Sequence, residues 1–259
     1  MDPRRGLEAR LLFLALGFPL VLGFGGCSNP EAVKSPAELL EENSTVVEEL
    51  KSYDSRERTR GISRFKKLPK DQGTALILYI LSDPKLDDYR LEIILARILA
   101  DWKDARAIPF LLSGLESPDD GAARIAFEGL VVFGDQPRIL AALEELLKSP
   151  VQQNRLRAAE ALSKIGGEEA VGFLGTAYKG EIDATVRAQM LLGVIKSRHP
   201  QRKQFLVDAL TDTDQALRQT AWDELKRYRD LPKVEYSPDG SLEDRARAVG
   251  ELRIWVKGR

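Results

Sequence analysis

The chain of 259 residues contains one cysteine and one histidine. These counts exclude an internal disulfide and zinc sites of the Cys/His type, because each needs more residues of these kinds, and Cys–His catalysis is not expected. An excess of one charge sign is also absent, since 39 Lys and Arg residues face 40 Asp and Glu residues and leave a net charge of -1. General binding of nucleic acid normally needs a strong basic excess, so no nucleic-acid partner is expected.

Long apolar runs are missing as well. The longest one extends from Leu11 to Phe24 and falls short of the about 20 residues that span a bilayer. It follows Arg4, Arg5 and Arg10 and leads into small residues, as in a secretory signal peptide. An uncleaved signal anchor would show the same pattern.

The end of this run, Phe24-Gly25-Gly26-Cys27, resembles a bacterial lipobox, although Phe24 stands where Leu is usual. The resemblance implies cleavage before the only cysteine and lipidation of Cys27. Ser28 in the next position would direct a lipoprotein of a Gram-negative host to the outer membrane, on the periplasmic side. Several acyl chains would make this anchor effectively permanent, because each buried methylene contributes about 0.8 kcal/mol.

The rest of the chain repeats with a period of about 32 residues. The residues three, four and seven positions after each repeat anchor are almost all apolar, which predicts one buried stripe on a helix. Asp residues stand four positions before five of the anchors and are predicted N-caps. The anchors are Arg58, Leu91, Ala123, Arg155, Arg187 and Arg218. The predicted caps are Asp54, Asp87, Asp119, Asp183 and Asp214, and Val151 holds the remaining position.

Each predicted first helix is followed by a second apolar stretch. Gly134 and Gly166 lie where two of the first helices are expected to end with a positive φ. The second stretches are 75–81, 108–115, 139–147, 171–178 and 205–210. Each unit is therefore predicted to be a helix, a short turn and a second helix.

This pattern resembles short bacterial HEAT repeats, with Asp before the first helix and Arg within it, over Ser44 to Tyr228. The matching pairs are Asp54 with Arg58, Asp183 with Arg187 and Asp214 with Arg218. The resemblance implies an all-α fold, a right-handed α-solenoid of about six helix-turn-helix repeats with capping helices at its ends. The expected segments are 1–26 (signal peptide), 27–43 (lipidated N-terminus, tether and start of the cap), 44–230 (solenoid) and 231–259 (turn and capping helix).

Residues able to carry chemistry have plain structural explanations. His199 is expected to be an exposed turn residue, and the paired carboxylates fall on caps and turns, where Asp is favoured. These pairs are Asp87-Asp88, Asp119-Asp120, Asp101 with Asp104, and Glu168-Glu169. The arginines at 58, 155, 187 and 218 are expected to pair with the Asp caps of adjacent repeats. We therefore predict no catalytic residue, metal site or cofactor.

Binding of protein partners is instead expected on the second helices, which line the concave face in this class of fold. Trp102, at a turn, is either a binding hot spot or packed on the neighbouring repeat. The polar candidates carry mixed charge, so no charge class of ligand is indicated. The candidate binding residues are Trp102, Tyr79, Ser113, Lys148, Tyr178 and Lys203.

The expected function is a lipid-anchored, non-enzymatic scaffold that binds protein partners at the bacterial cell envelope. Two alternatives stay open. Some HEAT-like proteins resemble bilin lyases or DNA glycosylases, so the chain could be an enzyme or bind a small ligand, although an export signal argues against both. A purely structural link between the membrane and another envelope layer is the other alternative.

Overall fold

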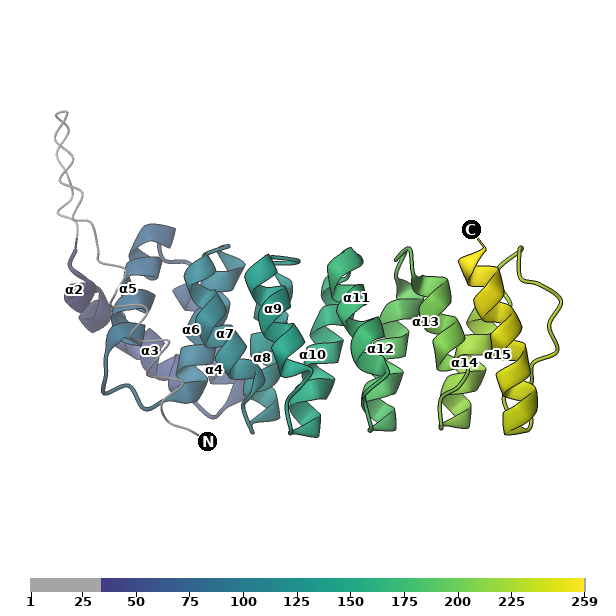
Figure 1. Cartoon of the computed structure of the whole chain (residues 1–259). Helices are drawn as coiled ribbons and strands as arrows, with labels where there is room; N and C mark the ends of the chain where they lie inside the picture. The colour runs from purple at the N-terminus through teal and green to yellow at the C-terminus, as the bar shows by residue number, and fades with distance from the viewer. Residues whose placement is uncertain (1–33, 259) are drawn as a thin grey trace, which may run out of the picture. The chain divides into compact units, whose positions relative to one another are not determined.

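The computed structural model describes residues 34–258, so the predicted signal peptide and Cys27 lie outside the described residues. Within residues 34–258 every regular element is helical, which confirms the all-α, solenoid-type fold class. The chain divides into two compact units, Met1–Phe133 and Gly134–Arg259, each with a core of its own (Figure 1).

The first unit pairs α3 with α4, packs α2 against α5, and groups α6, α7 and α8 into a tight cluster. Its core is aliphatic, with Leu76, Leu95 and Leu111 fully buried. The elements are α2 (Pro36–Glu42), α3 (Ser44–Lys51), α4 (Ser55–Phe65), α5 (Lys70–Ser82), α6 (Tyr89–Asp101), the short 3-10 helix η1 (Ala105–Ala107), α7 (Ile108–Leu115) and α8 (Asp120–Val131).

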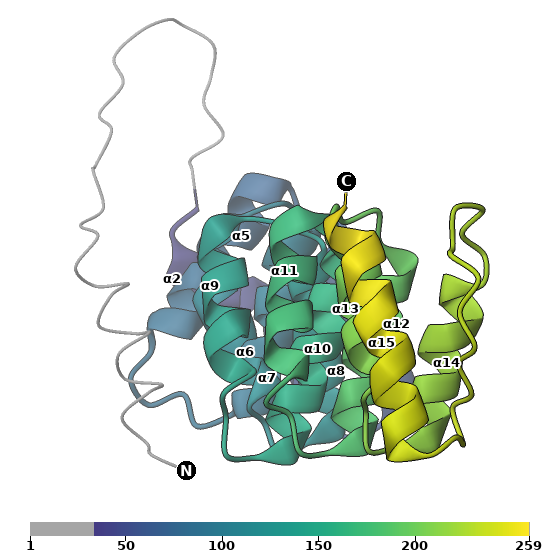
Figure 2. The same cartoon turned by 45° about the vertical axis from the view of Figure 1, so that its right-hand side comes forward.

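The second unit is more regular. Helices α10, α12 and α14 pack in succession, and α9, α11, α13 and α15 follow one another beside them (Figure 2). The elements are α9 (Pro137–Leu146), α10 (Gln152–Ile165), α11 (Gly167–Tyr178), α12 (Ala184–Lys196), α13 (Arg202–Ala209), α14 (Gln215–Leu225) and α15 (Leu242–Lys257).

The buried stripe predicted from the repeat is confirmed at two of its three positions, whereas four positions after the anchors Ile62, Phe127 and Trp222 are only half-buried. The residues three and seven positions after the anchors are all buried, and those at seven are at most 2% exposed. These innermost residues are Phe65, Ile98, Leu130, Leu162, Val194 and Leu225. Burial of one such side chain contributes about 1.5–3 kcal/mol to the stability of the fold.

The predicted helix caps are confirmed at four of the five Asp positions. Asp54, Asp119, Asp183 and Asp214 each accept two backbone N–H groups from the first turn of the helix that follows. The prediction of Asp87 is wrong, because α6 begins one residue later and Asp88 accepts from the Leu91 N–H. The positive φ is confirmed at both glycines, at 70°, but only Gly166 ends its helix directly, because α8 already ends at Val131.

The last helix has a second role that the sequence did not indicate. The sequence predicts that residues 231–259 form a turn and a capping helix. In addition, α15 packs against α13 and occupies the second-helix row (Figure 2). The long connector before it is fixed by Tyr236, whose hydroxyl donates to the Leu210 carbonyl at 2.7 Å. The helix thus completes the sixth hairpin and covers its core.

The repeated arginines bind the loops that precede the first helices. The Nη1 group of Arg187 donates to the carbonyls of Glu181 and Ile182, at 3.1 and 2.9 Å. Arg58, Arg155 and Arg218 donate in the same way to the carbonyls five and six residues before them. Each arginine therefore closes the loop at the start of its own repeat.

The expected pairing of these arginines with the Asp caps is wrong. Arg155 donates two hydrogen bonds to Glu181, at 2.7 and 2.9 Å, and Arg187 donates two to Asp212, at 2.8 and 3.0 Å. Both acids lie two residues before a cap in the next repeat. The caps Asp183 and Asp214 accept the backbone N–H groups of the first turn through Oδ1, and the arginines bind the acids two residues earlier instead. Arg90, outside the repeat register, does pair with a cap, Asp119.

Candidate functional site: a groove between α9 and α11

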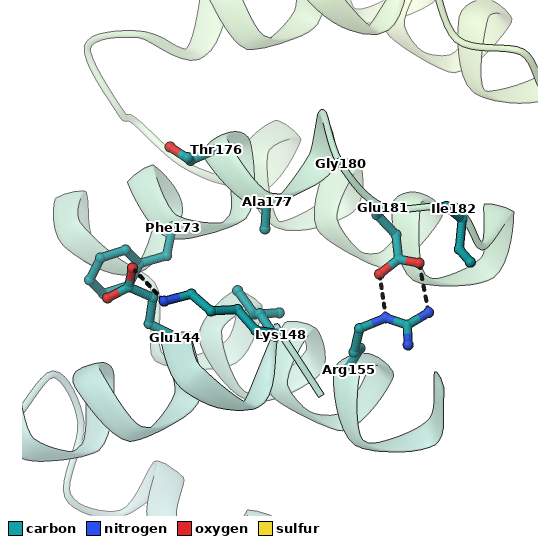
Figure 3. A pocket seen from close by; sticks show the side chains of 10 residues that line it. Glu144, Lys148, Arg155, Phe173, Thr176, Ala177, Gly180, Glu181 and Ile182 are labelled. Carbon is teal, nitrogen blue, oxygen red and sulfur yellow. Dashed lines mark hydrogen bonds and ion pairs between the residues drawn. The ribbon is translucent and has the colours of Figure 1, made fainter. Parts of the chain in front are cut away.

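A groove with a volume of about 610 Å³ lies in the second unit. Its walls come from the end of α9, the start of α10, the last turns of α11 and the loop before α12 (Figure 3). The volume falls within the range of sites that receive small molecules or a few side chains. Two consecutive repeats are needed to form it, because each contributes one wall.

Apolar side chains line much of the groove. Leu147 is buried in its floor, and Phe173 and Ala177 are half-buried on α11. Ile182 lies at the rim with 87% of its surface exposed. Asp183 directly after it caps α12, and the Ile182 carbonyl is bound by Arg187, so the backbone of this loop is fixed while the side chain faces solvent.

Two ion pairs give the walls their polar character. Arg155 and Glu181 form a two-bonded pair whose side chains are only 13% and 3% exposed. Burial by itself would raise the pKa of Glu181, but its hydrogen bonds with Arg155 and the Asp183 N–H outweigh burial and lower it. This carboxylate therefore stays charged at neutral pH. The pair is a fixed, neutral wall of the groove.

Lys148 forms the movable part of the lining. Its ammonium lies 2.7 Å from Glu145 and 3.7 Å from Glu144, and its side chain is largely exposed (Figure 3). The hydrogen bond with Glu145, followed by the nearby charge, raises the pKa of Lys148. Exposed pairs of this kind contribute little stability, so Lys148 can exchange its partner for a ligand carbonyl or carboxylate at small cost.

The side chains that could carry chemistry are few in the lining of the groove. Its lining contains no histidine or cysteine, and the carboxylates of Glu144 and Glu181 are held in ion pairs. The one hydroxyl, on Thr176, points away from the groove (Figure 3).

Of the residues predicted for binding, only Lys148 lines this groove. Tyr178 donates its hydroxyl to Asp212 at 2.5 Å, and burial, then this bond, raises its pKa strongly. Lys203 pairs with Asp230 at 2.8 Å and lies over the rings of Tyr228 and Trp255 at 4.8 and 4.6 Å. Tyr178 and Lys203 therefore fasten repeats together within the unit.

The remaining candidates lie in the first unit and do not come together. Tyr79 is 44% exposed on α5, and the carbonyl of Ser113 accepts the Tyr89 hydroxyl at 2.7 Å. Trp102 packs on Phe65, and a Cβ at Gly73 would lie 2.6 Å from its Cη2 atom. Of the two interpretations of Trp102, the structure shows packing.

Five of the residues considered for acid–base chemistry have structural partners. His199 is half-buried rather than exposed, and its Nδ1 accepts the Gln201 N–H at 3.0 Å. Asp88 and Asp119 cap helices, while Asp101 and Asp104 form ion pairs with nearby arginines. Over residues 34–258, no group of three His, Cys, Asp or Glu side chains could hold a metal ion. In the same range no helix has the length and apolar character to cross a bilayer.

Sequence reasoning missed Phe173, Glu181 and Ile182. Glu181 and Ile182 precede the Asp183 cap. An apolar residue in such a polar loop is a signal from which Ile182 could have been predicted as a binding residue. Phe173 gave none, because its place on a second helix looks like that of any core residue.

Comparisons with known proteins agree with this architecture. A family profile described as HEAT repeats matches residues 74–163 and 108–193, so this part of the chain carries HEAT repeats. No curated protein matches the chain.

Several solved structures are similar to the chain. An engineered protein shares 19% identity, with 71% of this chain and 95% of that chain covered and a TM-score of 0.42. Human deoxyhypusine hydroxylase, in complex with glycerol, shares 18% identity over 85% and 98% of the two chains, with a TM-score of 0.31. The complex of CpcE and CpcF of phycocyanin lyase from a Nostoc species shares 22% identity over 92% and 100%, with a TM-score of 0.40. Similarity at this level carries no argument about activity.

Proposed function

We propose that this chain is a membrane-tethered, non-catalytic HEAT-repeat scaffold that binds a protein partner through the groove between α9 and α11. The observation that carries the proposal is Ile182, an isoleucine 87% exposed on a fixed loop at the rim of an apolar groove. Solvation of a large apolar side chain is unfavourable, and its burial by a partner would contribute about 1.5–3 kcal/mol.

The chemistry of the lining favours a polypeptide. An apolar side chain of the partner fits between Phe173 and Ala177, and the exposed Lys148 can bind a backbone carbonyl beside it. The Arg155–Glu181 pair is neutral and internally satisfied, so it accepts apolar neighbours without a further charge. Short helices and extended segments with one apolar anchor bind such grooves.

The tether is the second part of the proposal. The sequence from Arg4 to Cys27 has the order of a lipoprotein signal, and it supports cleavage before Cys27 and lipidation of that residue. The proposed location is the bacterial cell envelope, and in a Gram-negative host the periplasmic side of the outer membrane. A non-catalytic role is supported by the engaged carboxylates and by the lining of the groove.

Site-specific photo-crosslinking in the producing cell tests the groove. A photoreactive amino acid in place of Ile182 should give one defined protein adduct, which Ala177→Trp abolishes by filling the groove and Ala177→Ser leaves in place. The matched control is Ile254, which is 73% exposed on α15 and outside the groove. Equal adducts from both positions, or an adduct that persists in Ala177→Trp, would refute the proposed site.

The tether is tested by intact mass of protein from the membrane fraction, with wild type beside Cys27→Ser. Loss of residues 1–26 with added lipid mass, abolished in the variant, is the expected result. A full-length or unlipidated product would overturn the anchor and leave the groove to be judged by its own experiment.

A further inference from the structure

Helix α4 carries a line of basic side chains on its outer face. Arg56, Arg60, Arg64 and Lys67 follow one another at spacings of four, four and three residues, which places them on one side of the helix and its final turn. Gly61 and Phe65, on the opposite side, are buried. At a rise of 1.5 Å per residue, the line extends about 16 Å.

Three of these cations have no carboxylate partner among residues 34–258. Arg56, Arg60 and Lys67 are exposed and form no ion pair there, while Arg64 pairs with Glu49 at 2.8 Å. The acids nearest in sequence form hydrogen bonds with neutral groups. Asp54 caps α4, and Glu57 accepts the Ser52 hydroxyl at 2.7 Å. The four cations still exceed the two carboxylates near them, Glu49 and Glu57, so the face has a net positive charge on a chain whose net charge is -1.

The repeat itself does not require this charge. The positions equivalent to Arg56 in the later first helices hold Tyr89, Gly121, Gln153, Thr185 and Ala216. Those equivalent to Arg60 hold Ile93, Ile125, Arg157, Gln189 and Thr220. Arg157 is the single basic residue among these ten, and it is buried. A line of arginines at these positions is thus particular to α4 and stands apart from the packing pattern.

We infer that the outer face of α4 binds the headgroups of anionic phospholipids. A straight row of exposed cations on a helix matches a surface of negative charge, and the attraction of such segments to membranes is well established physically. The position in the chain supports a lipid surface over another polyanion, an argument that rests on the proposed tether. Residues 28–35 separate Cys27 from α2 and span at most about 28 Å, so α4 lies in the hairpin next to the anchor.

The consequence is a defined orientation on the membrane. A lipid anchor alone leaves the protein free to tilt, whereas a second contact at α4 turns one face of the first unit toward the bilayer. The contact is electrostatic, so it weakens as salt rises, because the Debye length falls from about 10 Å at 0.1 M to about 3 Å at 1 M.

The test places an environment-sensitive fluorophore on the lipidated protein through Thr59→Cys, on the outer face of α4. Cys27 is the only native cysteine, so the new thiol is the single free site once Cys27 is lipidated. Thr220→Cys on α14 is a matched control, because both threonines are exposed and both hydroxyls donate to the carbonyl four residues earlier, at 2.8 Å. The probes are vesicles of phosphatidylcholine alone or mixed equally with phosphatidylglycerol.

We expect the label at position 59 to report membrane contact on the anionic vesicles only, and to lose that signal at high salt. The label at position 220 should not respond on either vesicle. Arg56→Gln, Arg60→Gln and Lys67→Gln together should lower the ratio of contacting to free α4 by roughly a hundredfold. The double variant Arg56→Lys, Arg60→Lys retains the charge and should retain the contact, which separates a charge effect from a folding defect.

An unchanged signal at position 59 on anionic vesicles would overturn the inference, and so would full contact in the neutralised variant. A response to poly-glutamate with none to the vesicles would assign the face to an acidic polypeptide instead. Flotation distinguishes the tether from this contact. Protein that floats with both kinds of vesicle but gives no signal contradicts the α4 contact alone, whereas protein that fails to float with neutral vesicles contradicts the tether.

Discussion

Asp212 joins three parts of the second unit through one buried carboxylate. Its carboxylate accepts hydrogen bonds from the Tyr178 hydroxyl at 2.5 Å, from the Nε and Nη2 groups of Arg187, and from the Asp214 N–H at 2.8 Å. Burial would raise the pKa of Asp212, but the hydrogen bonds from Arg187 and Tyr178 outweigh burial and lower it. The carboxylate is thus held charged by neighbours from three different helices or loops.

Asp212→Asn should lower the free energy of unfolding by about 3 kcal/mol, because it leaves the buried Arg187 guanidinium without its counter-charge. Urea denaturation followed by circular dichroism measures the change. The control is Asp223→Asn on α14, an exposed pair with Lys226 at 2.6 Å, where a change within about 0.5 kcal/mol is expected. Equal losses in both variants would contradict a special role for the buried pair.

The same residue predicts how stability depends on pH. A carboxyl with a lowered pKa in the folded state stabilises the fold above its unfolded pKa of about 3.9, and that stabilisation is lost as pH falls through the lower folded value. Wild type should therefore lose stability below about pH 4 more steeply than Asp212→Asn, which has no proton to take up there. Thermal unfolding midpoints between pH 6 and pH 3 test this, and parallel curves for the two proteins would contradict it.

The role of Trp102, packing or binding, can be tested by measuring the free energy of unfolding. Its ring packs on Phe65 and over Gly73, so Trp102→Ala should cost about 2–3 kcal/mol of unfolding free energy, less than for a fully buried Trp. Tyr79→Ala, which truncates a more exposed aromatic residue in the same unit, should cost less than about 1 kcal/mol. Chemical denaturation measures both. A Trp102→Ala variant as stable as wild type would restore the binding interpretation.

At the scale of the element, the helices follow from local signals in the sequence. A recurring Asp and an apolar residue at positions three, four and seven predict where each first helix begins and which face is buried. The predicted cap Asp87 is wrong by one residue, because α6 begins one residue later in its repeat than the other first helices do. The apolar stretch 108–115 coincides with α7, whereas the stretches in α5 and α11 begin several residues late, because these two helices start with residues that no apolar pattern marks.

The one first helix without an Asp cap offers a gain of stability. Val151 precedes α10 in the extended conformation of a cap, is 51% exposed and supplies no side-chain acceptor. Val151→Asp should therefore raise the unfolding free energy by about 1 kcal/mol, as an Asp there accepts N–H groups of the first turn. Val151→Ala lacks an acceptor and should bring no gain. Thermal unfolding of the two variants measures the difference. A gain of stability of the same size in both variants would rule out capping as the cause of the gain.

The groove could not be predicted from the helices taken one at a time. Its walls belong to two repeats, and the side chains that meet in it, such as Phe173 and Ile182, are close only because α11 and the loop before α12 are stacked on α9. A single sequence contains the period but not the small displacement between neighbouring repeats. Lys148 was predicted from its polar position on a second helix, whereas its apolar neighbours in the groove could not be distinguished from core residues.

At the scale of several repeats, the arginines of the second unit link one repeat to the next. In the second unit Arg155 binds Glu181, whose carbonyl is bound by Arg187, which in turn binds Asp212. Arg218 continues the series to the Asp212 carbonyl and ends on the Pro238 carbonyl in the connector to α15. A solenoid stabilised by nearest neighbours in this way responds to the loss of one end by losing the adjoining repeat first.

Truncation of the chain after Asp230 should therefore unfold α13 and α14 before the rest of the molecule. The deletion removes α15 and uncovers the cluster that includes Leu206, Leu210 and Leu225, all fully buried in the intact unit. It also removes Pro238, the last acceptor of Arg218. Hydrogen exchange measured by mass spectrometry should show lost protection in α13 and α14, while α6 and α8 of the first unit keep theirs.

The control for the truncation is Ile254→Asp, which changes an exposed residue of α15 and leaves the helix in place. This variant should exchange like wild type throughout. Unchanged protection of α13 and α14 in the truncated chain would contradict the nearest-neighbour account, because it would mean that the sixth hairpin is stable without its second helix. Loss of protection that reached α6 and α8 to the same degree would contradict it in the other direction, since the two units would then unfold as one cooperative body.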